Sequence, residues 1–170
     1  NKFGINLSEL EKVTDLVLTL PNIKMVGIHF HIASQITDMS SFQDLCIKVN
    51  ELQEYFESKS VKLQHVNVGG GLGISYEHPN HLSIPDFESY FKVFRKYLIL
   101  RPGQTLHFEL GRAVVAQCGS LISRVLYVKE GTLKKFAILD AGFTELIRPA
   151  LYQAYHRIEN LSSELPEEEY

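Results

Sequence analysis

Hydrophobic positions along the first two thirds of the chain follow two alternating periods. Apolar side chains at helical spacing predict three helices, over residues 8–20, 40–58 and 85–98. Short apolar runs between them predict three strands, over residues 24–32, 63–68 and 105–109. Strands that alternate with helices at a repeat of about 40 residues imply parallel pairing with crossover helices. We therefore expect an α/β fold in which residues 1–112 form part of a TIM-type β/α barrel.

Local signals mark the boundaries of these helices. Ser8 stands three residues before Glu11, a spacing typical of a capping box, and Pro21 ends the same helix. The third helix opens at Pro85-Asp86-Phe87. The second helix carries one apolar stripe, made of Phe42, Leu45, Val49, Leu52 and Phe56.

The pattern changes after residue 112. Residues 114–129 are rich in β-branched side chains, residues 130–132 form a turn, and residues 135–139 predict another strand. These signals indicate antiparallel pairing, with a short helix over residues 146–154. We expect residues 113–170 to begin an all-β C-terminal domain that is incomplete, so that the chain is an internal fragment of a longer protein.

Composition narrows the range of functions. The 170 residues are 45% hydrophobic and 22% charged, with a net charge of −3, which gives no basis for binding nucleic acid or anionic lipid. No apolar run approaches the roughly 20 residues of a membrane span, so we expect no membrane partner. Cys46 and Cys118 form neither a metal-binding spacing nor a disulfide framework. We expect both to be packing residues, no metal site, and a cytoplasmic location.

Three polar or glycine-rich clusters follow the three predicted strands. The first strand ends in His29-Phe30-His31 and continues to Ser34, the second opens into Gly69-Gly70-Gly71, and the third ends in Glu109-Leu110-Gly111-Arg112. Because chemistry gathers at the carboxyl ends of parallel strands, we expect the clusters to meet at one edge of the sheet.

Each cluster also has a purely structural interpretation. His29 could be a hydrogen-bonded core histidine, an interpretation that fits His31 less well because it lies nearer the edge. The glycines could form only a tight turn. Glu109 and Arg112 could be a structural ion pair.

Together, the clusters suit a flat, nitrogen-containing ring with a phosphate tail. Backbone N–H groups of Gly69–Gly71, with Ser34 and Arg112, would satisfy a phosphate dianion. The His31 imidazole can lie against a ring face. The Glu109 carboxylate can keep a pyridine nitrogen protonated, which makes the ring an electron sink. These are the requirements of pyridoxal 5′-phosphate acting on an amino acid.

Several motifs, in this order and spacing, resemble the diaminopimelate decarboxylase branch of the alanine-racemase-like, fold type III pyridoxal-phosphate enzymes. The resemblance covers essentially the whole chain. The motif most specific to this branch runs from Arg148 to Tyr152. The matching segments are residues 2–5, 29–35, 69–73, 109–112, 140–143, 146–152 and 155–156.

The resemblance implies a lyase of lysine biosynthesis that decarboxylates meso-2,6-diaminopimelate to L-lysine. It implies that His31 stacks on the cofactor ring and that Glu109 pairs with its nitrogen. The phosphate side would be held by Ser34, Gly69, Gly70, Gly71, Gly111 and Arg112. The carboxylates of the amino-acid substrate would be held by Arg112, Arg148 and Tyr152. Ala33 and Leu110 depart from the family pattern, which usually has glycine and proline there.

The resemblance also implies a homodimer with shared active sites. In the family, a lysine on the first barrel strand anchors the cofactor and a cysteine comes from the partner subunit. Neither falls within the matched region, so we expect the chain alone to be inactive. Three alternatives stay open. The first is a decarboxylase of another basic amino acid, of the arginine or ornithine type. The second is a non-catalytic pyridoxal-phosphate carrier, and the third is a phosphate-binding barrel without pyridoxal chemistry.

Overall fold

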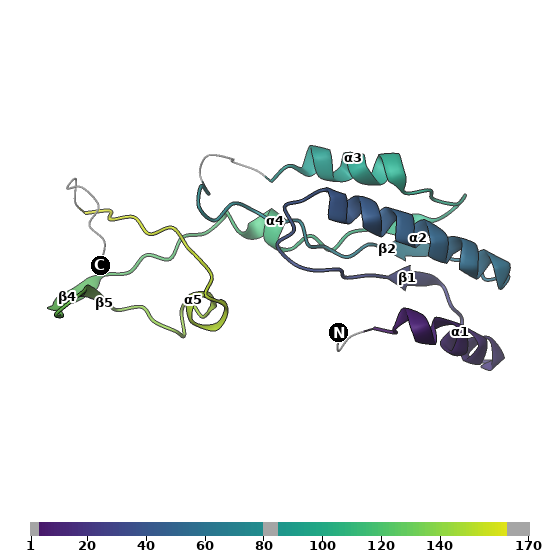
Figure 1. Ribbon diagram of the computed structural model, residues 1–170, viewed down its shortest axis with the longest axis horizontal. Coiled ribbons are helices and arrows are strands. Elements are labelled where there is room, and N and C mark those ends of the chain that lie inside the picture. The colour runs from purple at the N-terminus through teal and green to yellow at the C-terminus, as the bar shows by residue number, and fades with distance from the viewer. Residues whose placement is uncertain (1–3, 80–84, 163–170) are drawn as a thin grey trace. The chain divides into compact units, whose positions relative to one another are not determined.

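The computed structural model describes residues 4–79 and 85–162 (Figure 1). The chain divides into two compact units. The first unit comprises Asn1–Leu72 and Asp86–Leu110, and the second comprises Gly73–Pro85 and Gly111–Tyr170.

A parallel sheet forms the centre of the first unit. Its strands lie in the order β1-β2-β3. Their bounds are Gly27–His29 for β1, His65–Asn67 for β2 and Thr105–His107 for β3. Gly27 pairs with His65 in the parallel register, and His65 pairs in turn with Thr105. The predicted parallel pairing is confirmed. Each strand is shorter than its apolar run, because three residues of each run join the ladder.

The helices of the first unit follow the predicted order. Their bounds are η1 Leu7–Glu9, α1 Leu10–Thr19, α2 Ser40–Ser58 and α3 Phe87–Tyr97. The predicted capping box is wrong: the α1 N-cap has no side-chain hydrogen bond, and the Asn6 amide instead donates to Glu9 at 3.1 Å. At α3, Asp86 accepts a hydrogen bond from the Ser89 N–H at 2.9 Å, which fixes the start of that helix.

The apolar stripe of α2 packs as its spacing predicts. Figure 1 shows α2 and α3 side by side, and the two helices are in contact. Phe42 is fully buried, and its ring meets the Tyr90 ring of α3 edge-on, with centroids 4.8 Å apart. Val66 of β2 is also fully buried. All five predicted stripe residues are buried: Phe42, Leu45, Val49, Leu52 and Phe56.

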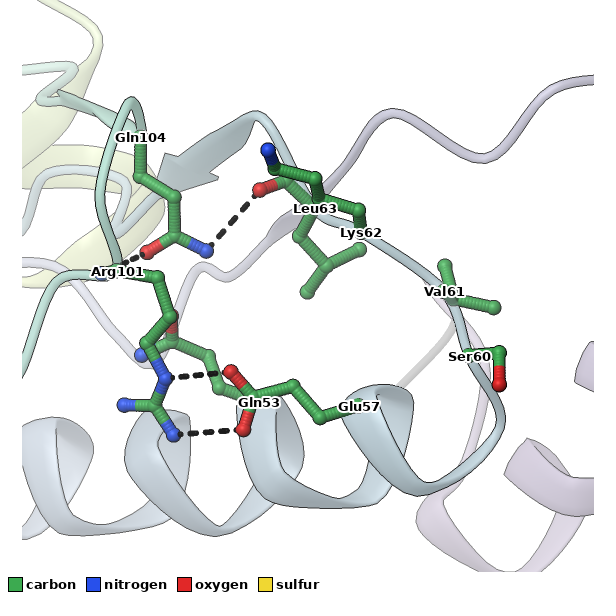
Figure 2. A pocket seen from close by; sticks show the side chains of 8 residues that line it. All are labelled: Gln53, Glu57, Ser60, Val61, Lys62, Leu63, Arg101 and Gln104. Atoms are coloured by element: carbon green, nitrogen blue, oxygen red, sulfur yellow. Dashed lines mark hydrogen bonds and ion pairs between the residues drawn. The ribbon is translucent and has the colours of Figure 1, made fainter.

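Polar contacts fasten the loop before β3 to α2, at the amino ends of the strands. Figure 2 shows the Arg101 guanidinium making two hydrogen bonds to the Glu57 carboxylate, at 2.8 and 3.3 Å. Gln104 donates to the Leu63 carbonyl at 3.1 Å, beside the start of β2. A hollow of about 270 Å³ lies among these residues. It opens at the amino ends of β2 and β3, opposite the edge where the predicted site clusters follow the strands.

The second unit contains an antiparallel hairpin and two short helices. The hairpin pairs β4 (Val125–Glu130) with β5 (Lys135–Leu139), which confirms the predicted turn and antiparallel pairing. The strand predicted from residue 114 begins eleven residues later, because the first part of that run forms α4, Arg112–Val115, with Ala113 buried. The short helix predicted over residues 146–154 is α5, Arg148–Tyr152.

Two further expectations concern burial and membranes. Cys46 is fully buried, and burial raises the pKa of its thiol to about 11, so its predicted role in packing is confirmed. Cys118 is exposed, so the same prediction is wrong for that residue. None of the helices in the described ranges has the length and apolarity to cross a bilayer.

Replacing Phe42 tests the α2–α3 core. We expect Phe42→Ala to lower the free energy of unfolding by about 3–5 kcal/mol, because a fully buried ring leaves a cavity. Ile47→Ala removes an apolar side chain of α2 that is 46% exposed, and should cost under about 1 kcal/mol. Urea unfolding followed by circular dichroism measures both. Equal losses for the two variants would contradict this description of the core.

Candidate active site

One face of the parallel sheet is polar. Successive strand residues point to opposite faces, so Val66 points into the buried core while His65 and Asn67 point the other way. In the parallel register Asn67 pairs with His29 on one side and with His107 on the other. The polar side chains therefore form rows across the strands. The row of His29, Asn67 and His107 lies at the carboxyl ends, where parallel sheets place their chemistry.

Glu109, which follows β3, is the acceptor for two side chains of this face. One carboxylate oxygen lies 3.0 Å from His29 Nε2, and the other accepts a hydrogen bond from Asn67 Nδ2 at 3.0 Å. The Asn67 hydrogen bond, with a smaller contribution from His29, holds the pKa of the Glu109 carboxyl below its ordinary value. The side chain is nevertheless 51% exposed. It is an ionised, oriented carboxylate that a ligand can still reach.

The glycine run is packed against the ends of the two flanking strands. A Cβ on Gly69 would lie 2.2 Å from the Phe30 carbonyl oxygen, and one on Gly70 would lie 2.2 Å from that of Glu109. Gly69 also has φ +70° and Gly71 has φ +105°, a region that side chains disfavour. From the sequence, we explained the glycines by the close approach of a ligand. The structure gives a different reason, since backbone of the neighbouring strand ends already fills the space that a side chain would need.

The same run leaves donors available. The Gly69 N–H donates to the Asn67 side chain at 2.9 Å. Among the described residues, the N–H groups of Gly70 and Gly71 have no hydrogen-bond acceptor, although Gly70 is buried. Adjacent unpaired amides form a concavity suited to an anion.

The first unit brings together most of the predicted cofactor residues. The Cα of His31 lies 3.4 Å from the position that a Cβ would take on Gly69. The carbonyl oxygen of Ala33, the residue before Ser34, lies 2.5 Å from the Cβ position of Gly71. His31 and Ser34 are exposed. The prediction that the three clusters meet at one edge is confirmed for His31, Gly69–Gly71 and Glu109. His29 is hydrogen-bonded but exposed, so its interpretation as a core histidine is wrong.

The second unit holds the predicted arginine and tyrosine residues. Gly111 is the N-cap of α4 and Arg112 its first residue, while Arg148 and Tyr152 begin and end α5. The two guanidinium groups lie over one ring: the carbon of Arg112 is 6.0 Å from the Tyr76 centroid, and that of Arg148 is 5.4 Å away. Arg148 also lies 5.9 Å from the Tyr152 centroid.

Sequence reasoning missed Tyr76, and it placed His156 in a matching segment without giving it a role. The His156 ring meets the Tyr76 ring edge-on at 5.4 Å, and both Arg148 Nε and His156 Nε2 are buried without a hydrogen-bond partner. The available signal was an aromatic residue shortly after the glycine run, a position that the strand pattern left unexplained. Unpaired buried donors beside two arginines favour an anionic ligand.

This geometry agrees with a family assignment. Residues 1–116 match the family model described as "Pyridoxal-dependent decarboxylase, pyridoxal binding domain". The chain belongs to this family of pyridoxal-dependent decarboxylases. The expected cofactor, pyridoxal phosphate, follows from this membership.

Individual relatives carry a more particular name. The chain is 63% identical over all 170 residues to the diaminopimelate decarboxylase of Bacteroides thetaiotaomicron, and it spans 44% of that protein. It is 38% identical to the diaminopimelate decarboxylase of Neisseria meningitidis serogroup B, where the match covers 94% of this chain and 37% of the relative. The chain therefore spans less than half the length of these relatives.

Solved structures show the same similarity. The diaminopimelate decarboxylase of Helicobacter pylori, complexed with L-lysine, matches with a TM-score of 0.79 and 33% identity over 96% of this chain and 40% of that one. A lysine/ornithine decarboxylase from Vibrio vulnificus matches with a TM-score of 0.73 and 18% identity, covering 86% of this chain and 41% of that one. At 18% identity the second match shows a shared fold alone.

The residues of the first unit fit pyridoxal phosphate. A protonated pyridine nitrogen needs an ionised acceptor, and Glu109 is one. A phosphate needs clustered donors, and Gly70 and Gly71 offer unpaired amides. Among the described residues, no group of three or more histidine, cysteine, aspartate or glutamate side chains is placed to hold a metal ion.

Adding a methyl group to the glycine run tests its packing. We expect Gly70→Ala to lower the free energy of unfolding by about 1–3 kcal/mol, because its Cβ would collide with backbone that cannot move aside like a flexible side chain. Gly119→Ala is the matched control, since no atom lies within 4 Å of its Cβ position. Thermal and urea unfolding measure both. A Gly70→Ala variant as stable as Gly119→Ala would refute the close approach.

Proposed function

We propose that this chain forms the cofactor-binding part of a pyridoxal-phosphate-dependent enzyme that decarboxylates meso-2,6-diaminopimelate to L-lysine. The observation that carries the proposal is an ionised, ligand-accessible Glu109 beside the unpaired amides of Gly70 and Gly71. The named relatives support the choice of substrate, since the match to one of them covers every residue of the chain. Because the chain spans only part of these relatives, the reaction is proposed for a polypeptide that includes it.

Each cofactor residue has a separate task in this proposal. Glu109 accepts a hydrogen bond from the ring nitrogen, and its negative charge favours the protonated ring. The His31 imidazole, exposed at the same edge, lies against a ring face. The bound cofactor supplies an electron sink for the electrons released when carbon dioxide leaves. The phosphate is held by Ser34, Gly69, Gly70, Gly71, Gly111 and Arg112.

The second unit supplies the substrate contacts. Arg112 and Arg148 present guanidinium groups, which bind carboxylates through paired N–H donors. Tyr152 shares α5 with Arg148 and lies against its guanidinium. A substrate with a carboxylate at each end suits such a group of cations. The Helicobacter pylori relative was solved with L-lysine, which is the product of the proposed reaction.

The proposal includes the wider architecture. The parallel strands and the family match support a TIM-type barrel over residues 1–112, followed by an all-β domain that begins at residue 113. A homodimer with shared active sites and a cytoplasmic location stay predictions from the sequence. So does the inactivity of the chain by itself, with its anchoring lysine and partner cysteine supplied from elsewhere.

Binding of two ligands tests the cofactor site. We expect the chain to bind pyridoxal phosphate, and Glu109→Gln to weaken that binding about tenfold, because a charge-assisted hydrogen bond is lost. Benzyl phosphate, which has no ring nitrogen, should bind both forms equally. Glu145→Gln is the control, since Glu145 is another exposed carboxylate with a lowered pKa. Calorimetric titration decides, and equal pyridoxal-phosphate affinity in the Glu109→Gln and unaltered chains would count against the proposal.

Lysine formation tests the substrate assignment. In a polypeptide extended to the length of the relatives, we expect Arg148→Gln to raise the KM for meso-diaminopimelate at least tenfold, because a carboxylate loses its guanidinium partner. Arg157→Gln is the control, since Arg157 instead pairs with Glu159 at 2.8 Å. A chromatographic assay for L-lysine gives both constants. An unchanged KM in Arg148→Gln would favour a different amino acid as the substrate.

A further inference from the structure

Asn67 makes two hydrogen bonds that join separate parts of the candidate site. Its side-chain oxygen accepts from the Gly69 N–H at 2.9 Å, and its side-chain nitrogen donates to Glu109 at 3.0 Å. A backbone N–H can only donate, so the oxygen of the amide must face Gly69 and its NH₂ must face the carboxylate. The two contacts therefore fix each other, and no rotated form of the side chain satisfies both.

A backbone contact completes this arrangement. The Glu109 N–H donates to the Gly69 carbonyl at 2.7 Å, so Gly69 and Glu109 are joined both directly and through Asn67. Gly69 begins the glycine run, and Glu109 follows β3. Three hydrogen bonds among Asn67, Gly69 and Glu109 therefore fix the distance between the proposed phosphate donors and the proposed ring-nitrogen acceptor.

The titratable groups around Glu109 are histidines from the neighbouring strands. His29 of β1 lies 3.0 Å from the carboxylate, and His31, beyond β1, also favours its ionised form. On the same polar face, His65 and His107 are hydrogen-bonded to each other, with Nδ1 and Nε2 3.0 Å apart. Asn67 has no titratable group, and its side-chain nitrogen donates to Glu109 at any pH at which the carboxylate is ionised.

We propose that Asn67 is a positioning residue, which ties the glycine run to Glu109 and so keeps the phosphate donors and the ring-nitrogen acceptor in one register. The inference rests on the proposed function for its ligand, but its hydrogen bonds belong to the chain alone. Because the folded pKa of Glu109 is lowered, its ionised form stabilises the fold above the unfolded pKa. This contribution is lost as the pH falls through the lowered value.

Asn67→Asp separates the two contacts. The aspartate retains an oxygen to accept from the Gly69 N–H, but it replaces the donor to Glu109 with a second carboxylate. Two carboxylates in contact cannot both ionise freely, so the pKa of Glu109 should rise. Asn67→Ala removes both contacts. Asn50→Asp is the matched control, because Asn50 also uses its side chain twice, to Tyr97 and Ile99, away from the site.

Carbon-13 NMR titration of the Glu109 carboxyl in the 170-residue chain is the primary measurement. We expect a higher midpoint in Asn67→Asp than in the unaltered chain, and the original midpoint in Asn50→Asp. In the unaltered chain, the Asn67 side-chain amide signals should shift with the same midpoint as Glu109. This second measurement needs no substitution and decides the question even if Asn67→Asp fails to fold. Two results would overturn the inference. One is an unchanged Glu109 midpoint in folded Asn67→Asp, and the other is a set of Asn67 amide signals that do not shift as Glu109 titrates.

Ligand binding then separates this inference from the proposed function. Asn67→Asp should weaken pyridoxal phosphate about tenfold and leave benzyl phosphate unchanged, whereas Asn67→Ala should weaken both. Loss of both ligands to the same extent in Asn67→Asp would show a general structural role and overturn the inference. If neither ligand binds the unaltered chain, the proposed function fails, while the two NMR midpoints still test the link between Asn67 and Glu109.

Discussion

The structure of the candidate site depends on one close approach of backbone to backbone. Gly69 and Gly70 run between the ends of β1 and β3, with no room for a side chain beside the carbonyls of Phe30 and Glu109. This contact brings segments that are far apart in the sequence to the same edge of the sheet. The approach requires glycine at both positions, because a Cβ on either residue would collide with a carbonyl oxygen and force the strand ends apart.

The two faces of the parallel sheet have different roles. The buried face of the sheet supplies stability through Val66 and the α2–α3 packing, and the opposite face carries polar groups. The Glu109 carboxylate is half exposed, and the hydrogen bonds from Asn67 and His29 lower its pKa and fix its orientation. A rigid backbone with an accessible charge is well suited to hold a ligand that carries its own reactivity.

Sequence reasoning succeeded where a local pattern decides the structure. The bounds of α2 and β5 agree with the prediction, since a strong apolar stripe and a turn before residue 135 leave few alternatives. It failed where contacts distant in sequence decide. The β-branched run after residue 112 begins as helix α4, because Ala113 is buried there, and tertiary packing overrides propensity. The meeting of the glycine run with Glu109 was predictable from parallel topology.

The partners of the site residues were not predictable from the sequence. Nothing in the spacing of Asn67 shows that its amide bridges Gly69 and Glu109, because that depends on register across two strands. Tyr76 likewise became visible only when Arg112 and Arg148 were placed over its ring.

A crystal structure of this chain with pyridoxal phosphate would show whether Glu109 and the glycine run hold the two ends of one cofactor. We expect the ring nitrogen within hydrogen-bonding distance of a Glu109 carboxylate oxygen, and phosphate oxygens on the amides of Gly70 and Gly71. A cofactor bound with its ring nitrogen away from Glu109, or its phosphate away from the glycine run, would contradict it.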